Sequence, residues 1–198
     1  MRRLVFVVIG LGLVAIIVIG LVQASGKSTS SSDSSSPARA PSLARAQKQL
    51  QGSPPALASL HRQAGRLLGG GPGAYDARLR SLRGHPVVVN FWAAWCGPCR
   101  VEFPVLQRTV PTVGRQVAFM GVDVEDSNAA AAKFLRQHPV VYPSYEDPHR
   151  SLINDLGAQG LPTTAYYDKR GKLAYVHQGP YATDAALKRD IRRYLGTT

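Results

Sequence analysis

The sequence is short of cysteine. Its 198 residues contain only two, Cys96 and Cys99, separated by two positions. A small secreted domain held together by disulfides carries more cysteines at wider spacings, so that class of protein is excluded. A structural zinc site normally takes four Cys or His ligands, and the nearest histidines, His85 and His138, follow no ligand spacing. The pattern that remains is a redox pair.

Acidic residues are also scarce, since 12 Asp and Glu stand against 24 Lys and Arg, which gives a formal net charge of +12. Such a balance indicates nucleic-acid binding when the basic residues form a compact patch. Here they are spread from Arg39 to Arg193, with no basic stripe interleaved with aromatic residues. The sequence therefore predicts a solvated basic surface and no nucleic-acid partner.

One long apolar run stands at the N-terminus. After two arginines, residues 4–22 are all apolar or glycine, which as a helix would cross the roughly 30 Å hydrocarbon layer of a bilayer. The preceding arginines place the N-terminus inside and the rest of the chain outside the cytoplasm. We expect residues 1–22 to be a transmembrane helix that anchors the protein to the cell membrane by a single pass. A cleaved signal peptide ending near Ala24 is the alternative.

Composition divides the remainder into three parts. Residues 23–41 are rich in Ser and Pro and bury too little apolar surface to offset their ordering entropy, which predicts a flexible linker. Residues 42–83 are predicted to be a helical extension, with helices over 55–68 and 74–82. Residues 84–198 are long enough for one folded domain.

Strands and helices alternate through that domain. A continuous β-branched and aromatic run over 87–92 predicts a buried central strand. The other expected elements are a helix over 96–108, a strand over 116–123, a helix capped by Ser127, a strand over 140–145, a helix over 147–157, strands over 161–167 and 172–178, and a helix capped by Thr183. This alternation predicts an α/β sandwich with a mixed central sheet flanked by helices.

The position of the cysteine pair indicates its chemistry. Cys96 follows the central strand and stands at a helix start, where unpaired N–H groups and a partial positive charge stabilise thiolate over thiol. The thiolate is the nucleophile of thiol–disulfide exchange, and Cys99, one turn later, can resolve the mixed disulfide. Neither step needs a metal or an organic cofactor, and we expect neither.

Residues 90–99, Asn-Phe-Trp-Ala-Ala-Trp-Cys-Gly-Pro-Cys, resemble the active-site strand, loop and helix start of the thioredoxin superfamily. The resemblance covers about residues 86–195 and implies a thioredoxin-like fold. It also implies that Trp95, Gly97 and Pro98 shape the face on which substrate docks. The Gly-Pro dipeptide matches that of reducing thioredoxins, whose potentials lie near about −270 mV, against about −120 mV for the oxidant DsbA.

A second element of this resemblance lies far downstream. Residues 160–164, Gly-Leu-Pro-Thr-Thr, are similar to the loop that carries the superfamily's cis-proline beside the cysteine pair. An X–Pro bond tolerates the cis form far better than any other bond. The resemblance implies a cis bond before Pro162 and a backbone at Leu161 that pairs with the extended chain of a substrate.

The region between Asp123 and Pro162 is longer than in plain thioredoxin. With the N-terminal anchor and residues 99–104, it resembles the TlpA/ResA group of membrane-anchored extracytoplasmic thioredoxin-like proteins. Members of that group reduce disulfides in partners such as apocytochromes c or copper-site assembly proteins. The resemblance implies protein disulfide substrates and a membrane-embedded electron donor.

Glu102 matches the glutamate that this group carries three residues after its second cysteine, on the same helix face as Cys99. A partly buried carboxylate there would exchange the proton of the resolving thiol. Asn90 stands where plain thioredoxin has a buried aspartate, and Asn does not titrate. Proton handling is therefore expected at Glu102.

Two other functions remain open. The same exchange can run as an oxidase or isomerase, because the donor and the compartment set its direction. A copper-binding assembly module would use both thiolates as soft ligands and would want a third ligand, for which Met120 and His177 have no evident placement. A peroxidase is not expected, because the chain lacks a lone peroxidatic cysteine in its own motif.

Overall fold

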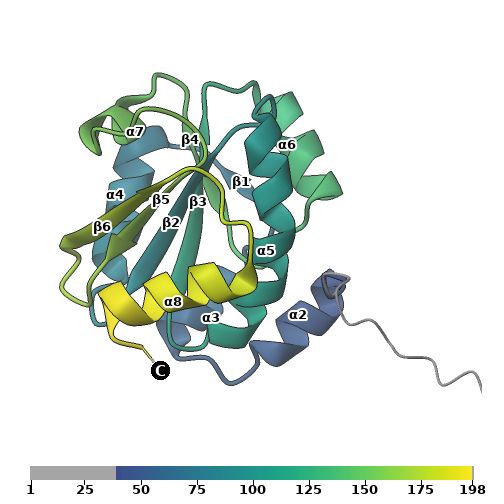
Figure 1. Cartoon of the computed structure of the whole chain (residues 1–198), viewed down its shortest axis with the longest axis vertical. Coiled ribbons are helices and arrows are strands. Elements are labelled where there is room, and N and C mark those ends of the chain that lie inside the picture. The colour runs from purple at the N-terminus through teal and green to yellow at the C-terminus, as the bar shows by residue number, and fades with distance from the viewer. Residues whose placement is uncertain (1–38, 198) are drawn as a thin grey trace, which may run out of the picture. The chain divides into compact units, whose positions relative to one another are not determined.

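A six-stranded mixed sheet forms the centre of the structure (Figure 1). The computed structural model describes residues 39–197. The strands are β1 (Leu67–Leu68), β2 (Val87–Trp92), β3 (Ala118–Val124), β4 (Ser144–Asp147), β5 (Thr163–Tyr167) and β6 (Leu173–Gln178). They lie in the order β1-β4-β3-β2-β5-β6, the first four parallel and the last two antiparallel to their neighbours. The predicted mixed sheet is confirmed.

Strand β2 separates two hydrophobic cores. All six of its residues are buried, as expected for a central strand covered on both faces. Because successive side chains point to opposite faces, Val88 and Trp92 belong to the first core, whereas Val87, Val89 and Phe91 belong to the second. The first core also contains both cysteines.

Seven helices among residues 39–197 cover these two faces. They are α2 (Leu43–Gln49), α3 (Pro55–His61), α4 (Gly71–Ser81), α5 (Gly97–Val113), α6 (Asn128–Gln137), α7 (Ser151–Asp155) and α8 (Asp184–Leu195). Side chains of α2, α5, α6 and α8 fill the first core, and side chains of α3, α4 and α7 fill the second. Figure 1 shows α8 lying across the sheet beside α5. The predicted caps are confirmed, since Ser127 Oγ and Thr183 Oγ1 accept the backbone N–H groups of Ala130 and Ala186.

The helix predicted over 55–68 was wrong in its second half. The chain leaves the helix after His61 and turns at Gly65, which has a positive φ of 66° and donates its N–H to Tyr142 O at 3.0 Å. Leu67 and Leu68 then form β1 and pair in parallel with β4. The extension over 42–83 is therefore not wholly helical, because it supplies an edge strand of the sheet.

Three other boundaries differ by four residues or more from those predicted. Helix α5 continues to Val113 rather than ending at 108. Strand β4 begins at Ser144, within the run predicted as a strand over 140–145. The helix expected from 147 begins only at Ser151, because Asp147 serves as an acceptor for the backbone N–H groups of Leu152 at 3.0 Å and Ile153 at 3.3 Å. Side-chain capping thus moves the helix start by several residues.

The predicted anchor over 1–22 and most of the predicted linker over 23–41 lie outside the described residues. Within residues 39–197, no helix combines the length and the apolar character that a membrane crossing requires.

Candidate active site

Cys96 and Cys99 are joined as a disulfide, with their Cα atoms 5.3 Å apart. Cys96 is the N-cap residue of α5, and its Sγ accepts the backbone N–H of Cys99 at 3.1 Å. Cys96 is 4% exposed and Cys99 is fully buried. Cys96 is therefore the less enclosed of the two cysteines and has a helix N–H directed at its sulfur, which is the arrangement that stabilises a thiolate after reduction.

The loop before Cys96 is fixed by three hydrogen bonds. The backbone N–H of Ala94 donates to the carboxylate of Asp126, and the guanidinium of Arg100 donates to Ala94 O. The indole N–H of Trp95 donates to Glu125 O at 3.2 Å, although the side chain is 56% exposed. Trp95 is therefore a large aromatic group held in place beside the sulfur.

The residues predicted to form the docking face surround Cys96. Trp95, Gly97 and Pro98 are all exposed, and an added Cβ at Gly97 would meet nothing within 4 Å. The surface next to the reactive sulfur is consequently open enough for a polypeptide to approach.

The peptide bond between Leu161 and Pro162 is cis. The sheet register pairs Thr163 with Phe91, which brings the preceding proline to the carboxyl end of β2, where the chain leaves for Cys96. The N–H and C=O of Leu161 bond to no other backbone group among residues 39–197. These two groups are the ones that the resemblance assigns to the extended chain of a substrate.

Glu102 is fully buried in α5, three residues after Cys99 and on the same helix face. Its Oε2 accepts the side-chain amide N–H of Asn90 at 2.8 Å, and its Oε1 accepts the backbone N–H of Tyr181 at 3.0 Å. Burial raises the pKa of Glu102 to about 7, and the two hydrogen bonds only partly oppose that shift. The Glu102 carboxyl can therefore gain and lose a proton near neutral pH.

Two residues that hold Glu102 were not predicted to do so. Asn90 was predicted only to be unable to titrate, yet its amide is a direct partner of the carboxylate. A buried amide needs a partner, so its place in a fully buried strand was a usable signal. Tyr181 contributes through its backbone, and nothing in the local sequence indicates that role.

The side chain of Tyr181 is held in place by three neighbouring side chains. Its hydroxyl lies 2.6 Å from the hydroxyl of Tyr166 and donates to Asp190 Oδ2 at 2.7 Å. Its ring stacks on His177 with the centroids 4.0 Å apart. These contacts with Tyr166, His177 and Asp190 fix the segment whose N–H reaches Glu102.

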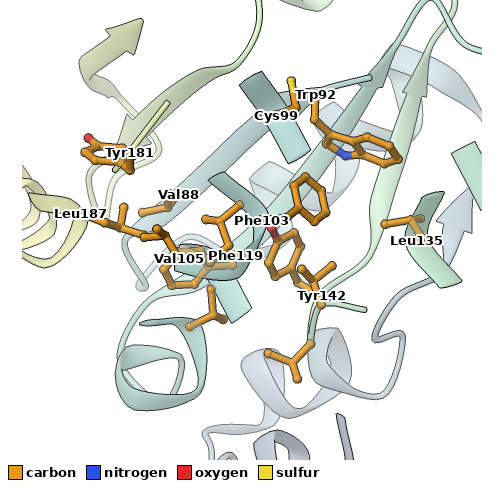
Figure 2. Close-up of a cluster of buried hydrophobic side chains, with 14 of the residues drawn as sticks. Val88, Trp92, Cys99, Phe103, Val105, Phe119, Leu135, Tyr142, Tyr181 and Leu187 are labelled. Carbon is orange, nitrogen blue, oxygen red and sulfur yellow. The ribbon is translucent and has the colours of Figure 1, made fainter. Parts of the chain in front are cut away.

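Trp92 forms a wall of the first core beneath the cysteines. It stacks on Phe134 at 4.8 Å, meets Phe103 edge-on at 5.5 Å, and donates its indole N–H to Ser144 Oγ at 3.1 Å. Figure 2 shows Trp92 and Cys99 at one end of this cluster. Gly121 leaves the space for that bond, because a Cβ there would lie 2.2 Å from Ser144 Oγ and 2.9 Å from the indole nitrogen.

A second buried carboxyl lies near the same end of the sheet. Asp123, the partner of Trp92 across β2 and β3, is 3% exposed, and its Oδ1 has no hydrogen-bond partner among the described residues. Burial raises the pKa of Asp123 to about 8, with further contributions from Asp126 and Glu146. The sequence analysis assigned this residue no role.

The described residues give no support to a third copper ligand. Among residues 39–197, no group of three His, Cys, Asp or Glu side chains is placed to hold a metal ion. Met120 lies in the second core, whereas Cys96 and Cys99 lie in the first, so this thioether is separated from the thiols by the sheet.

The chain matches known proteins in both sequence and structure. The model of the AhpC/TSA family matches residues 71–176, more than half of the chain. Thiol-disulfide oxidoreductase ResA of Geobacillus thermodenitrificans is 32% identical over 121 residues, which are 61% of this chain and 67% of that protein. Thiol:disulfide interchange protein DsbE of Pseudomonas aeruginosa is 41% identical over 91 residues, which are 46% of this chain and 49% of that protein.

Solved structures agree with these relatives. A putative thiol:disulfide interchange protein DsbE from Chlorobium tepidum superimposes with a TM-score of 0.55 at 32% identity, over 60% of this chain and 85% of that one. DsbF of MTB, solved in mixed oxidised and reduced forms, gives 0.53 at 29% identity, over 58% and 84%. With its bonded cysteine pair at a helix start, this thioredoxin-like chain therefore belongs to the AhpC/TSA family and is a thiol–disulfide oxidoreductase.

Proposed function

We propose that the chain is a membrane-anchored extracytoplasmic reductase, which receives electrons from a membrane-embedded donor and passes them to disulfides in protein partners such as apocytochromes c. The observation that carries the exchange chemistry is the position of Cys96 at the start of α5, where the N–H of Cys99 is directed at its sulfur and the neighbouring Trp95, Gly97 and Pro98 are exposed. The direction of the exchange rests on Gly97-Pro98, the dipeptide of reducing thioredoxins, and on the resemblance to ResA.

The reaction transfers two electrons to the partner. In the reduced protein, the Cys96 thiolate attacks one sulfur of the partner disulfide, which forms a mixed disulfide and releases the partner's other sulfur as a thiolate. The Cys99 thiolate then attacks the sulfur of Cys96. This step forms the Cys96–Cys99 disulfide of the structure and releases the partner's second thiolate. The partner leaves reduced and this protein leaves oxidised.

Glu102 handles the proton of the second step. Cys99 is fully buried and must lose its proton before it attacks. The Glu102 carboxylate lies on the same helix face three residues later, and its raised pKa of about 7 lets it accept that proton near neutral pH. The membrane donor reduces the disulfide again in the reverse sequence.

The partner is held as an extended chain across the docking face. The N–H and C=O groups of Leu161, which bond no other backbone group in the described part of the chain, bond the partner's backbone in the manner of an added strand. Trp95, Gly97 and Pro98 supply the exposed surface around the sulfur. Binding through the backbone fits a protein that acts on more than one partner sequence.

The test is a trap for mixed disulfides. A Cys99→Ser variant of the full chain retains the attacking sulfur and cannot resolve the intermediate, so partners with cysteine pairs accumulate in covalent complexes in the cells that make the protein. A Cys96→Ser variant is the matched control and captures none. Equal capture by the two variants would overturn the assignment of Cys96 as the nucleophile.

The redox state of the wild-type pair in intact cells tests the direction. A reductase fed by a donor keeps Cys96 and Cys99 mainly reduced. A mainly oxidised pair would overturn the reductase proposal in favour of an oxidase.

The anchor is tested by fractionation. We expect the full chain to remain with membranes after an alkaline carbonate wash, with its cysteines accessible from outside the cytoplasm. Release of a shortened chain into the soluble fraction would show that residues 1–22 act as a cleaved signal peptide instead.

A further inference from the structure

A hollow of about 500 Å³ lies beside the loop that precedes Cys96. One wall is formed by that loop and the first turn of α5, and the opposite wall by α6. Ala94, Ala130 and Phe134 supply apolar lining, and Trp95, which directly precedes Cys96, also lines the hollow. Figure 1 shows α5 and α6 side by side. The hollow lies near the start of α5, since Ala94, Trp95 and Arg100 line it.

Two exposed cations line the same hollow, which we name the α6 groove. Arg100 extends from α5 and Lys133 from α6. The ion pairs formed within residues 39–197 include neither of them. Arg100 donates one side-chain N–H to Ala94 O, and the Lys133 ammonium makes no hydrogen bond to another described residue. Both charges are therefore available to a ligand.

One carboxylate, Asp126, also lines the groove, so its lining holds two cations against one anion. Asp126 accepts the backbone N–H of Ala94 and lies against the buried carboxyl of Asp123. Burial lowers the pKa of His138 on the opposite wall, and the positive charge of Arg100 lowers this pKa further. The field of Arg100 therefore extends across the groove. The groove thus combines an apolar lining with positive charge.

We propose that the α6 groove binds an aspartate or glutamate side chain of the partner protein, located near the partner's disulfide cysteine. The aliphatic part of that side chain contacts Phe134 and Ala130, and its carboxylate bonds Arg100 and Lys133. This inference rests on the proposed function and adds a sequence preference to it, since Leu161 recognises only backbone.

The position of the groove favours a protein ligand over an anionic membrane surface. Trp95 lines the groove and directly precedes Cys96, so a chain with its disulfide at Cys96 passes the mouth of the groove. A bilayer headgroup has no comparable reason to lie against the reactive sulfur.

The test uses pairs of disulfide-bonded peptides that differ only in Glu against Gln, placed in turn at successive positions before the cysteine. With the full-length reduced protein, kcat/KM is expected to favour one Glu peptide over its Gln partner by about threefold at low salt, as for an exposed ion pair. In high salt the ratio falls toward one. The ratio is the readout because a general loss of folding or catalysis lowers both rates together.

Lys133→Glu is expected to reverse the preference, so that the Gln peptide reacts faster. Arg136→Glu is the matched control, because Arg136 is an exposed cation of α6 that does not line the groove, and it retains the preference. Equal rates for every peptide pair in the wild type would overturn the proposal. So would a preference that Lys133→Glu leaves unchanged, including the case in which Lys133→Glu weakens only the binding of anionic vesicles.

The proposed function fails in a different way. If the wild type reacts with neither peptide and also fails to reduce a small disulfide, the exchange chemistry itself is wrong and the groove proposal falls with it. If the small disulfide and the Gln peptides react but no Glu peptide is favoured, only the groove proposal is wrong.

Discussion

The two faces of the sheet are built differently, although the same strands supply both. On the face covered by α3, α4 and α7, β2 and β3 present only apolar side chains to the second core: Val87, Val89, Phe91, Ala118, Met120, Val122 and Val124. On the face covered by α5, α6 and α8, the same strands present Asn90, Gly121 and Asp123 near their carboxyl ends. Glu102 of α5 joins them there.

The polar face carries a cost that the apolar face avoids. Burying a polar group without full hydrogen bonding is unfavourable, and the Oδ1 atoms of Asn90 and Asp123 have no partner among the described residues. The same burial raises the pKa of Glu102 and of Asp123 toward neutral pH. The burial that costs stability therefore also brings the pKa values of these two carboxyls near neutral pH.

The largest difference between the faces is expected in catalysis. Glu102→Gln retains the shape and the hydrogen-bonding side chain but cannot accept a proton, so resolution of the mixed disulfide by Cys99 should slow by about 100-fold at neutral pH. The inflection near pH 7 in the rate profile should disappear with it. Rapid-mixing kinetics of the full-length protein over a range of pH measure both.

The matched control is Asp155→Asn. Asp155 lies in α7, one of the helices that cover the apolar face, and its side chain is exposed. The substitution also converts one carboxyl to an amide, and its rate profile should equal that of the wild type. If Glu102→Gln shows the same profile as Asp155→Asn, Glu102 has no role in proton transfer.

Packing should show a smaller contrast. Gly121→Ala forces a Cβ to within 2.2 Å of Ser144 Oγ and 2.9 Å of the Trp92 indole nitrogen, which should lower the free energy of unfolding by about 1–3 kcal/mol. Gly73→Ala, in α4, meets nothing within 4 Å and should leave stability unchanged or raise it by up to about 1 kcal/mol. Urea unfolding compares the two variants, and equal losses would refute the packing account of Gly121.

The remaining expected effect is the dependence of stability on pH. Because the pKa of Glu102 is raised in the folded state, its contribution to stability is full below its ordinary value of 4.5 and is lost as pH rises through about 7. Wild-type stability should fall across that window relative to Glu102→Gln, with a slope of at most about 1.4 kcal/mol per pH unit.

Asp123 has the same sign, and its contribution is full below its ordinary value of 3.8 and declines until pH passes about 8. Glu102→Gln should therefore retain a decline at higher pH, and Asp155→Asn should follow the wild type throughout. A wild-type curve parallel to that of Glu102→Gln over the lower window would contradict the raised pKa.

The elements that position the reactive sulfur could be predicted because each depends on a local pattern. The β-branched run of β2 and the Gly-Pro pair after Cys96 indicate a strand followed by a helix start. The cis bond before Pro162 was predicted from the resemblance of residues 160–164 to the cis-proline loop of the thioredoxin superfamily. The structure has β2, the start of α5 and the cis peptide at these places. Asp184–Leu195 likewise begins after its predicted cap.

The elements that depend on distant partners were missed. Leu67 and Leu68 continue a helical spacing of leucines, and only pairing with β4 makes them a strand. The bond from Tyr181 to Glu102 joins residues 79 positions apart, and its donor is a backbone group that every residue but proline possesses. The sequence analysis noted only that Asn90 cannot titrate, whereas its side-chain amide donates a hydrogen bond to the Glu102 carboxylate.

The central claim is that the helix start makes Cys96 a stable thiolate, and alkylation of the reduced full-length protein tests it most directly. Iodoacetamide labelling followed by peptide mapping should modify Cys96 well before the buried Cys99. The labelling rate should reach half its maximum well below the pH of about 8.5 at which free cysteine is half ionised. A half-maximum at or above that pH, or preferential labelling of Cys99, would contradict the account.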